Sequence, residues 1–107
     1  MGPGIEVTKD RHGSAVVLAV SGEIDVHTTP QLREALLGEI SNDSPTVVLD
    51  LAGVTFIDST GLSVLITALK RARSLGGDVR LRAPSHQVFK VLELTRLHQV
   101  FEVEDAP

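Results

Sequence analysis

The segment TVVLDLAGVTFIDSTGLSVLITAL, residues 46 to 69, decides the fold class of this chain because it places a strand directly before a helix. Its first six residues, TVVLDL, have the density of β-branched and aliphatic side chains that is typical of a buried strand. From Ser59 onward, apolar residues recur every three or four positions, which predicts a helix with one apolar face. This face consists of Leu62, Leu65, Ile66, Leu69 and Ala72. A buried strand followed by an amphipathic helix is the repeating unit of α/β proteins.

The residues upstream predict a hairpin and a helix. The runs IEVTKD (5–10) and AVVLAVSG (15–22) are strand-like and the short connection between them contains Gly13, so we expect them to pair antiparallel. We predict that the first helix begins at Thr29 and Pro30, because a threonine hydroxyl can accept a free backbone N–H and proline suits the first helical turn. The apolar face of this helix consists of Leu32, Ala35, Leu36 and Ile40.

Downstream, strands and helices continue to alternate. Gly53 marks a turn or bulge after the buried strand, and the glycine pair at 76 and 77 ends the second helix. DVRLRA (78–83) is a predicted strand, a third helix opens at Ser85, and VFEVE (100–104) is a short last strand. The order β-β-α-β-α-β-α-β predicts a single α/β domain over residues 1–107. Strands joined through helices pair in parallel, so we expect a mixed sheet of four to five strands covered by helices.

The composition limits the classes of function. The chain has 107 residues, the size of one domain, and no cysteine, which excludes disulfides, thiolate zinc sites and cysteine nucleophiles. A net charge of −4 and only three aromatic residues argue against direct nucleic-acid binding. We interpret a local cluster of bases as a solvated face; its members are Lys70, Arg71, Arg73, Arg80 and Arg82. The N-terminal MGPGIEVTKD lacks a signal-peptide pattern and no apolar run has the length of a membrane span, so we expect a cytoplasmic protein that does not bind membranes.

The turn FIDSTGL (56–62) holds more polar groups than a helix start requires. Asp58 and Ser59 are predicted to occupy the turn, with Gly61 in the first helical turn. Free backbone N–H groups and the helix dipole make such a terminus favourable for an anion, including a phosphate on Ser59. Gly61 lowers helix propensity, which we interpret as room for another molecule to approach closely. The alternative is that Ser59 or Asp58 only caps the helix.

Enzymatic interpretations of this turn fit poorly. The hydrolase motif G-x-S-x-G is absent because Ile57 stands two residues before Ser59, and Gly61 comes one residue too late for the D-[ST]-G turn of aspartic proteases. Asp50 resembles a receiver phospho-acceptor, but the acidic pair and the late lysine of such a magnesium site are missing. An enzyme acting through Asp58 or Asp50 is therefore the least favoured class, and we expect no cofactor. Metal-binding spacing is absent among the histidines, which are His12, His27, His86 and His98.

Two motifs of this chain resemble those of a known family. Residues 50–62 fit a D-L-x-x-V run followed by D-S-[ST]-G-L, and GEIDVHTTPQLREAL (22–36) fits a G-E-[IL]-D segment followed by a helix. The two motifs also have the separation found in that family. From about residue 5 to residue 103, the chain therefore resembles a STAS domain of the anti-sigma factor antagonist family. The resemblance implies the STAS fold.

The resemblance also implies a bacterial binding module that is not an enzyme. In this family, an anti-sigma factor that is also a serine kinase phosphorylates the serine that matches Ser59. The unphosphorylated antagonist binds that kinase and releases the sigma factor, and a phosphoserine phosphatase resets the phosphorylated form. An alternative is a phospho-regulated STAS scaffold module of a signalling complex that does not act on a sigma factor.

The predicted partner surface consists of Asp25, Asp58, Ser59, Thr60, Gly61, Ser63 and Val64. Val64 and Ala68 lie off the main apolar stripe of their helix, so two outcomes are open for them: exposed contacts with a partner, or ordinary burial beneath a neighbouring loop. Two positions depart from the family pattern. Thr60 is a second potential phospho-acceptor, and Arg96 stands where relatives often have glycine, so the third helix is expected to end differently.

Phosphorylation of Ser59 is expected to weaken binding without unfolding the domain. A phosphoserine carries about −1.5 to −2 charges, which a helix N-terminus stabilises by roughly 0.3–1 kcal/mol. At an interface the same charge repels acids, including Asp58 and Asp25. Each unit pair of like charges costs on the order of 4 kcal/mol at about 4 Å and an effective dielectric constant near 20.

Overall fold

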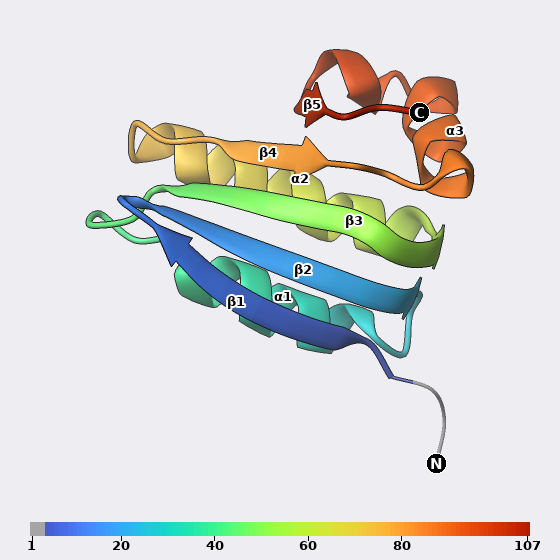
Figure 1. The fold of residues 1–107 in the computed structure, drawn as a ribbon, viewed down its shortest axis with the longest axis horizontal. Helices are drawn as coiled ribbons and strands as arrows, with labels where there is room; N and C mark the ends of the chain where they lie inside the picture. Colours follow the sequence, from blue (N-terminus) through green and yellow to red (C-terminus); the bar gives the residue numbers. More distant parts are fainter. Residues whose placement is uncertain (1–3) are drawn as a thin grey trace.

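The computed structural model describes residues 4–107, so the first three residues of the N-terminal stretch lie outside it. Five strands form one sheet in the order β1-β2-β3-β4-β5, which is also their order along the chain (Figure 1). The strands are β1 (Glu6–His12), β2 (Ala15–Ile24), β3 (Thr46–Ile57), β4 (Val79–Arg82) and β5 (Glu102–Glu104). The helices are α1 (Thr29–Glu39), α2 (Ser59–Ser74) and α3 (His86–Leu94), and a 3-10 turn, η1, spans Leu97–Gln99. β1 pairs antiparallel with β2 and each later pair is parallel, as predicted.

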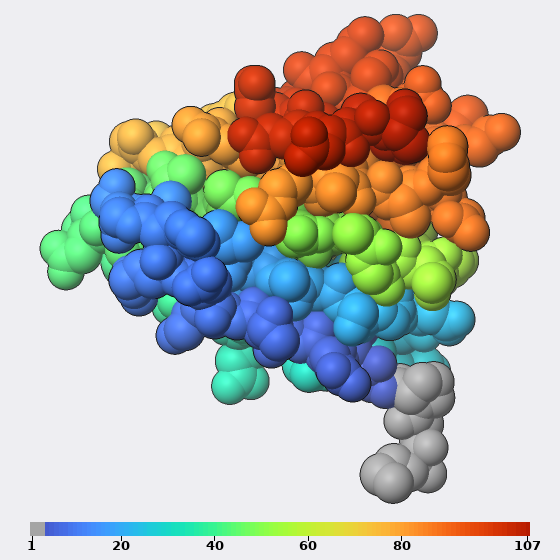
Figure 2. Space-filling view, in the orientation of Figure 1, coloured from blue at the N-terminus to red at the C-terminus, as the bar shows by residue number. Residues whose placement is uncertain are grey.

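The helices α1 and α2 cover one face of the sheet. They lie side by side behind it in Figure 1, while α3 packs against β3. Alternate residues of β2 and β3 point toward the helices and are buried, including Val16, Leu18, Val47 and Leu49. On the opposite face, the strands themselves reach the surface in chain order (Figure 2). The prediction of a mixed sheet covered by helices is thus correct for one face.

Strand β3 is longer than the predicted run 46–51, because two bulges carry it on to Ile57. At each bulge β3 has one more residue than β2, and the first one lies just before Gly53. The backbones come close here: a Cβ on Gly53 would lie 2.7 Å from the Cβ of Ser21. The predicted bulge at Gly53 is confirmed. Because each extra residue changes which side chains face the helices, the later buried positions are Val54 and Ile57.

The start of α1 differs from the prediction by one residue. Thr28 precedes the helix, Thr29 is its first residue, and Pro30 follows. The side chain of Thr28 makes no capping hydrogen bond to the helix. Its Oγ1 instead donates to the carbonyl oxygen of Glu23 (2.7 Å) and accepts from the N–H of Asp25 (3.0 Å). Thr28 therefore closes the loop between β2 and α1, and the prediction that Thr29 caps the helix is wrong.

The other helix ends follow known patterns. α2 ends as predicted, since Gly76 has a φ of +83° and the N–H groups of Gly77 and Gly76 donate to the carbonyl oxygens of Ala72 (2.8 Å) and Arg73 (3.1 Å). After α3, Arg96 has a φ of +60°, the left-handed conformation that glycine commonly supplies at this position. The arginine thus adopts the backbone of a glycine-terminated helix. None of the helices within residues 4–107 combines the length and the apolar character that crossing a membrane requires.

Candidate functional site

The carboxylate of Asp58 holds the turn between β3 and α2. Asp58 precedes the helix, and its Oδ1 accepts hydrogen bonds from the N–H groups of Thr60 (2.9 Å) and Gly61 (3.2 Å). The N–H of Asp58 donates to the carbonyl oxygen of Ile24 at the end of β2 (3.1 Å). Asp58, and not Ser59, therefore caps α2. Two of the N–H groups that we expected to be free for an anion are occupied by this carboxylate.

The hydroxyl of Thr60 belongs to the same cap. Its Oγ1 donates a hydrogen bond to Oδ1 of Asp58 at 2.5 Å. This hydrogen bond is the main reason why the pKa of Asp58 is lowered; the backbone N–H groups add to the effect and partial burial of the carboxyl opposes it. The carboxyl of Asp58 is therefore ionised at neutral pH. A fixed negative charge lies directly beside residue 59.

Ser59 differs from its neighbours because its side chain is exposed and makes no hydrogen bond within the described residues. It is the first residue of α2, and its carbonyl oxygen accepts a hydrogen bond from Oγ of Ser63 one turn later (3.0 Å). Ser63 is exposed as well, whereas Thr60 is half-buried. Of these three hydroxyl groups, only that of Ser59 is both exposed and free of a contact that a modifying enzyme would have to break.

Gly61 is required by packing inside the domain. A Cβ at this position would lie 2.5 Å from Cγ2 of Ile24 and 2.8 Å from Cγ1 of Ile57. These separations are shorter than side chains tolerate, and Gly61 itself is buried. The interpretation of this glycine as room for another molecule is therefore wrong. It allows the first turn of α2 to pack against the ends of β2 and β3.

The loop that contains Asp25 lies beside this turn because β2 and β3 end together. Ile24 pairs with Ile57 at the carboxyl ends of the two parallel strands. In the loop, Oδ1 of Asp25 accepts hydrogen bonds from the N–H groups of His27 (2.9 Å) and Thr28 (3.1 Å). The two motifs that are far apart in the sequence are thus brought to the same edge of the sheet.

Comparison with known proteins identifies the family. Residues 6–106 match the sequence profile of the STAS domain. The chain belongs to the STAS domain family. An anti-sigma-B factor antagonist of Listeria monocytogenes is 32% identical over 105 residues, which cover 98% of this chain and 91% of that protein. The crystal structure of an anti-sigma factor antagonist from Mycobacterium paratuberculosis matches with a TM-score of 0.83 and 29% identity, over 94% of this chain and 85% of that one.

The same STAS fold is found at lower identity in SpoIIAA, a Bacillus cell fate determinant. Its unphosphorylated form matches with a TM-score of 0.72 and 20% identity, over 92% of this chain and 87% of SpoIIAA. Its phosphorylated form matches with a TM-score of 0.71 and 21% identity, over 92% of this chain and 90% of SpoIIAA. Both forms of that protein therefore have the fold described above.

Val64 and Ala68 of this STAS domain are buried, with exposed fractions of 4% and 0%. The helix α2 packs against α1, β3 and β4, and Val64 lies between the two helices. Of the two outcomes that the sequence left open for these residues, burial is therefore the correct one. The next residue toward the turn, Ser63, is exposed.

Two exposed apolar side chains near the turn were missed by the sequence analysis. Val26 is 61% exposed and follows Asp25, and Phe56 is 48% exposed and lies three residues before Ser59. For Val26 a signal was present, because it stands in a polar loop and fits no helical or strand pattern. Phe56 could not be placed without the bulges, because simple alternation along β3 does not predict which of its side chains are exposed.

The other candidate residues of the STAS domain have structural roles. Asp50 accepts hydrogen bonds from the guanidinium of Arg82 (2.9 and 3.2 Å) and from the N–H of Ala52 (3.0 Å), so its carboxylate is engaged within the domain. In the basic cluster, the guanidinium groups of Arg73 and Arg80 lie 3.5 and 3.9 Å from the carboxylate of Asp78. Within residues 4–107, no group of three or more acidic or histidine side chains is arranged to hold a metal ion.

Proposed function

We propose that this STAS domain is an anti-sigma factor antagonist whose unphosphorylated form binds an anti-sigma factor with serine kinase activity and thereby releases a sigma factor. The names of relatives that match over most of their length support this class of partner. The observation that carries the proposal is the Ser59 hydroxyl, which is exposed, lies at the start of α2 and has no hydrogen bond within the described part of the chain.

Ser59 and not Thr60 is the proposed phospho-acceptor. The kinase must bring the γ-phosphate of ATP in line with the attacking hydroxyl oxygen. The hydroxyl of Thr60 is half-buried and donates to Asp58, so its phosphorylation would remove a hydrogen bond from the helix cap. Phosphorylation of Ser59 leaves the cap in place.

The proposed switch acts through charge. Phosphorylation adds about −1.5 to −2 charges at neutral pH, next to the ionised carboxylate of Asp58. A partner surface that fits a neutral hydroxyl must then accept a dianion, and each unit charge pair of like sign costs about 4 kcal/mol at 4 Å and an effective dielectric constant of 20. Since about 1.4 kcal/mol corresponds to a tenfold change in affinity, even a fraction of this repulsion releases the partner.

The proposed contact surface surrounds Ser59. Its polar members are Asp25, Asp58, Thr60 and Ser63, and its apolar members are the exposed side chains of Val26 and Phe56. Apolar area at the centre of an interface supplies binding energy, and the polar groups at its edge set the orientation. Gly61 and Val64 support this surface from beneath, because both are buried.

The proposal includes a complete regulatory cycle. The anti-sigma kinase phosphorylates Ser59, and a phosphoserine phosphatase restores the binding-competent form. The domain itself has no catalytic role and no cofactor in this cycle, and it does not contact nucleic acid. Because a sigma factor acts on RNA polymerase, the proposal also places the protein in the cytoplasm.

The test compares wild type with Ser59→Ala and Ser59→Asp in binding to purified candidate anti-sigma kinases by titration calorimetry. We expect wild type and Ser59→Ala to bind with similar affinity and to release the sigma factor. We expect Ser59→Asp to bind at least about tenfold more weakly, because like charges repel across the interface. Incubation with kinase and ATP should place one phosphate on Ser59, detected by mass spectrometry, and none on Ser59→Ala.

Ser74→Asp is the control for an added charge, because Ser74 is an exposed serine at the opposite end of the same helix. It should bind like wild type. Equal affinities of Ser59→Ala and Ser59→Asp would refute the switch. If Ser59 is phosphorylated and controls binding but no sigma factor is released, the scaffold function is the correct one.

A further inference from the structure

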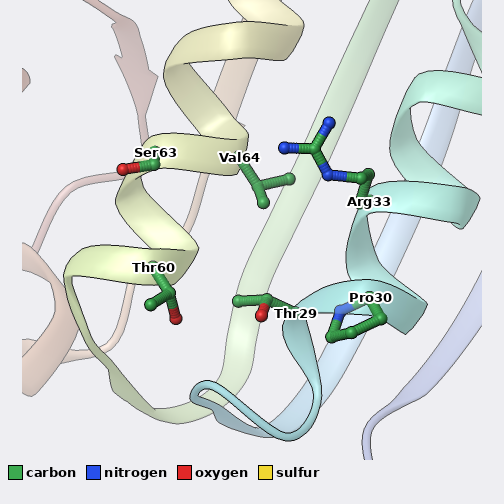
Figure 3. A pocket seen from close by; sticks show the side chains of 6 residues that line it. All are labelled: Thr29, Pro30, Arg33, Thr60, Ser63 and Val64. Atoms are coloured by element: carbon green, nitrogen blue, oxygen red, sulfur yellow. The ribbon is translucent and has the colours of Figure 1, made fainter.

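A groove of about 370 Å³ lies between α1 and α2, next to the proposed phospho-acceptor. Its lining residues are Thr29, Pro30 and Arg33 on the α1 side and Thr60, Ser63 and Val64 on the α2 side. In Figure 3 the guanidinium of Arg33 extends from α1 toward α2, and Val64 lies between the two helices. The groove therefore has apolar surface, hydroxyl groups and one positive charge among its lining residues.

Arg33 has no acidic partner within residues 4–107. Lys9, Arg73, Arg80 and Arg82 each pair with an acid of the domain, whereas Arg33 and the remaining lysines and arginines do not within the described part of the chain, and of these unpaired bases Arg33 is the one that lines this groove. A guanidinium presents its N–H donors in a planar fork that matches the two oxygens of a carboxylate. The exposed guanidinium of Arg33 is thus positioned to bind a carboxylate that another molecule supplies.

We propose that this groove receives an acidic side chain of the anti-sigma partner and that Arg33 forms the ion pair with it. This inference rests on the proposed function and adds the chemistry of the contact. The positive charge of Arg33 argues for an acidic occupant, and the apolar surface of Pro30 and Val64 suits the methylene groups of an aspartate or glutamate. A groove of this volume accommodates one such side chain with water around it.

Two of the residues that line the groove are neighbours of Ser59. Ser63, on the α2 side of the groove, donates its hydroxyl hydrogen bond to the carbonyl oxygen of Ser59, and Thr60 follows Ser59 in the chain. Ser59 is not itself a lining residue, but it directly precedes Thr60, so a phosphate on Ser59 adds negative charge close to the groove and disfavours binding of a carboxylate there.

The experiment uses the purified anti-sigma kinase and four forms of the protein: wild type, Ser59→Asp, Arg33→Glu and Arg71→Glu. Arg71 is an exposed base on α2 that lies outside the groove and makes no ion pair within residues 4–107, so its charge reversal is the matched control. We expect Arg33→Glu to weaken binding of the unphosphorylated form by about 30-fold or more, and Arg71→Glu to change it by less than about threefold. The urea midpoint of Arg33→Glu should equal that of wild type because the side chain is exposed.

A charge swap identifies the partner's acid. Changing the correct acidic residue of the kinase to arginine should restore binding to Arg33→Glu by at least about tenfold, and other acid-to-arginine changes should not. If Ser59→Asp loses binding while Arg33→Glu binds like wild type, the ion pair is refuted and the switch at Ser59 stands. If Ser59→Asp binds like wild type, the proposed function itself fails.

Discussion

The three hydroxyl side chains at the start of α2 are chemically similar but have different surroundings. Thr60 donates to the carboxylate of Asp58, Ser63 donates to the carbonyl oxygen of Ser59, and the hydroxyl of Ser59 makes no hydrogen bond within the described residues. A kinase that reaches this turn thus meets one free acceptor and two that are already engaged. Under the proposed function, hydrogen bonding within the domain would therefore favour Ser59 as the phospho-acceptor.

The close packing around Gly61 leads to a prediction about the stability of the variant Gly61→Ala. In Gly61→Ala the new Cβ must displace Ile24 or Ile57, because it would lie 2.5 and 2.8 Å from their side chains. Overpacking of this kind costs roughly 1–3 kcal/mol, and the higher helix propensity of alanine offsets up to about 1 kcal/mol of it. We expect a net loss of about 1–2 kcal/mol in the free energy of unfolding, measured by urea denaturation.

Gly38→Ala is the matched control. Gly38 is an exposed glycine of α1, and a Cβ there would meet nothing within 4 Å. This variant should be as stable as wild type or more stable by up to about 1 kcal/mol. If Gly61→Ala were as stable as Gly38→Ala, the packing explanation would be incorrect and the glycine would have to be explained by access to a partner.

The stability of the domain should depend on pH through the Asp58 carboxylate that caps α2. The hydrogen bond from Thr60 and the backbone N–H groups lower the pKa of Asp58 in the folded state, so the folded protein binds its proton more weakly than the unfolded chain does. The stabilisation is complete above the ordinary value of 3.8 and is lost as the pH falls through the lower pKa of the folded state. We expect Asp58→Ala to cost about 1 kcal/mol at pH 7 and progressively less below pH 4, measured by urea denaturation at each pH.

Asp43→Ala is the control that tests whether the pH dependence of stability arises from the helix cap and not from the loss of any carboxylate. Asp43 is an exposed acid in the loop between α1 and β3 and makes no side-chain hydrogen bond within residues 4–107. Its removal should have little effect at any pH. A cost for Asp58→Ala that stayed constant from pH 7 to pH 2.5 would show that the cap does not depend on the charge of the carboxylate.

The elements themselves were predictable because their apolar residues follow simple periods. Leu62, Leu65, Leu69 and Ala72 of the predicted face of α2 are buried, although the buried face is wider than predicted, and the end of this helix at the glycine pair agrees with the prediction. The start of α1 was missed because Thr28 and Thr29 are equally good caps in sequence, and the tertiary contact of Thr28 with Glu23 decides between them. The full length of β3 was missed because its bulges interrupt the period of two.

The candidate site was predictable only in part. Asp58 and Ser59 were identified because a helix start imposes local requirements on residue type. The accessibility of Gly61 and Val64 was predicted incorrectly, because it depends on other elements: the ends of β2 and β3 pack against Gly61, and Val64 faces the groove between α1 and α2. Arg33 gave no signal in the sequence, since a base on the polar face of a helix is common. Its position beside a groove exists only after α1 and α2 pack together.

The whole domain should change little when Ser59 is phosphorylated. The side chain is exposed, and the turn beneath it is held by the cap and by the hydrogen bond from Asp58 to Ile24. The phosphate cannot use the two N–H groups that Asp58 occupies, so we expect a small destabilisation of up to about 1 kcal/mol. For a domain of this size, such a change lowers the melting temperature by no more than roughly 4–8 °C.

Two measurements check this expectation on the phosphorylated protein. Calorimetry should give a melting temperature within that range of the unmodified form. Changes in amide chemical shift should be confined to the 25–29 loop and the 57–64 turn. Shifts that spread through β4, β5 and α3 would contradict a switch based on local charge and would indicate a conformational change instead.

The spatial order of the strands, identical to their order along the chain, bears on biosynthesis. Each strand pairs with the one translated just before it, so the nascent polypeptide can add one β-α-β unit after another as it leaves the ribosome. None of the five described strands pairs only with a strand that is synthesised much later. The domain can therefore complete its sheet soon after the last strand has left the ribosome.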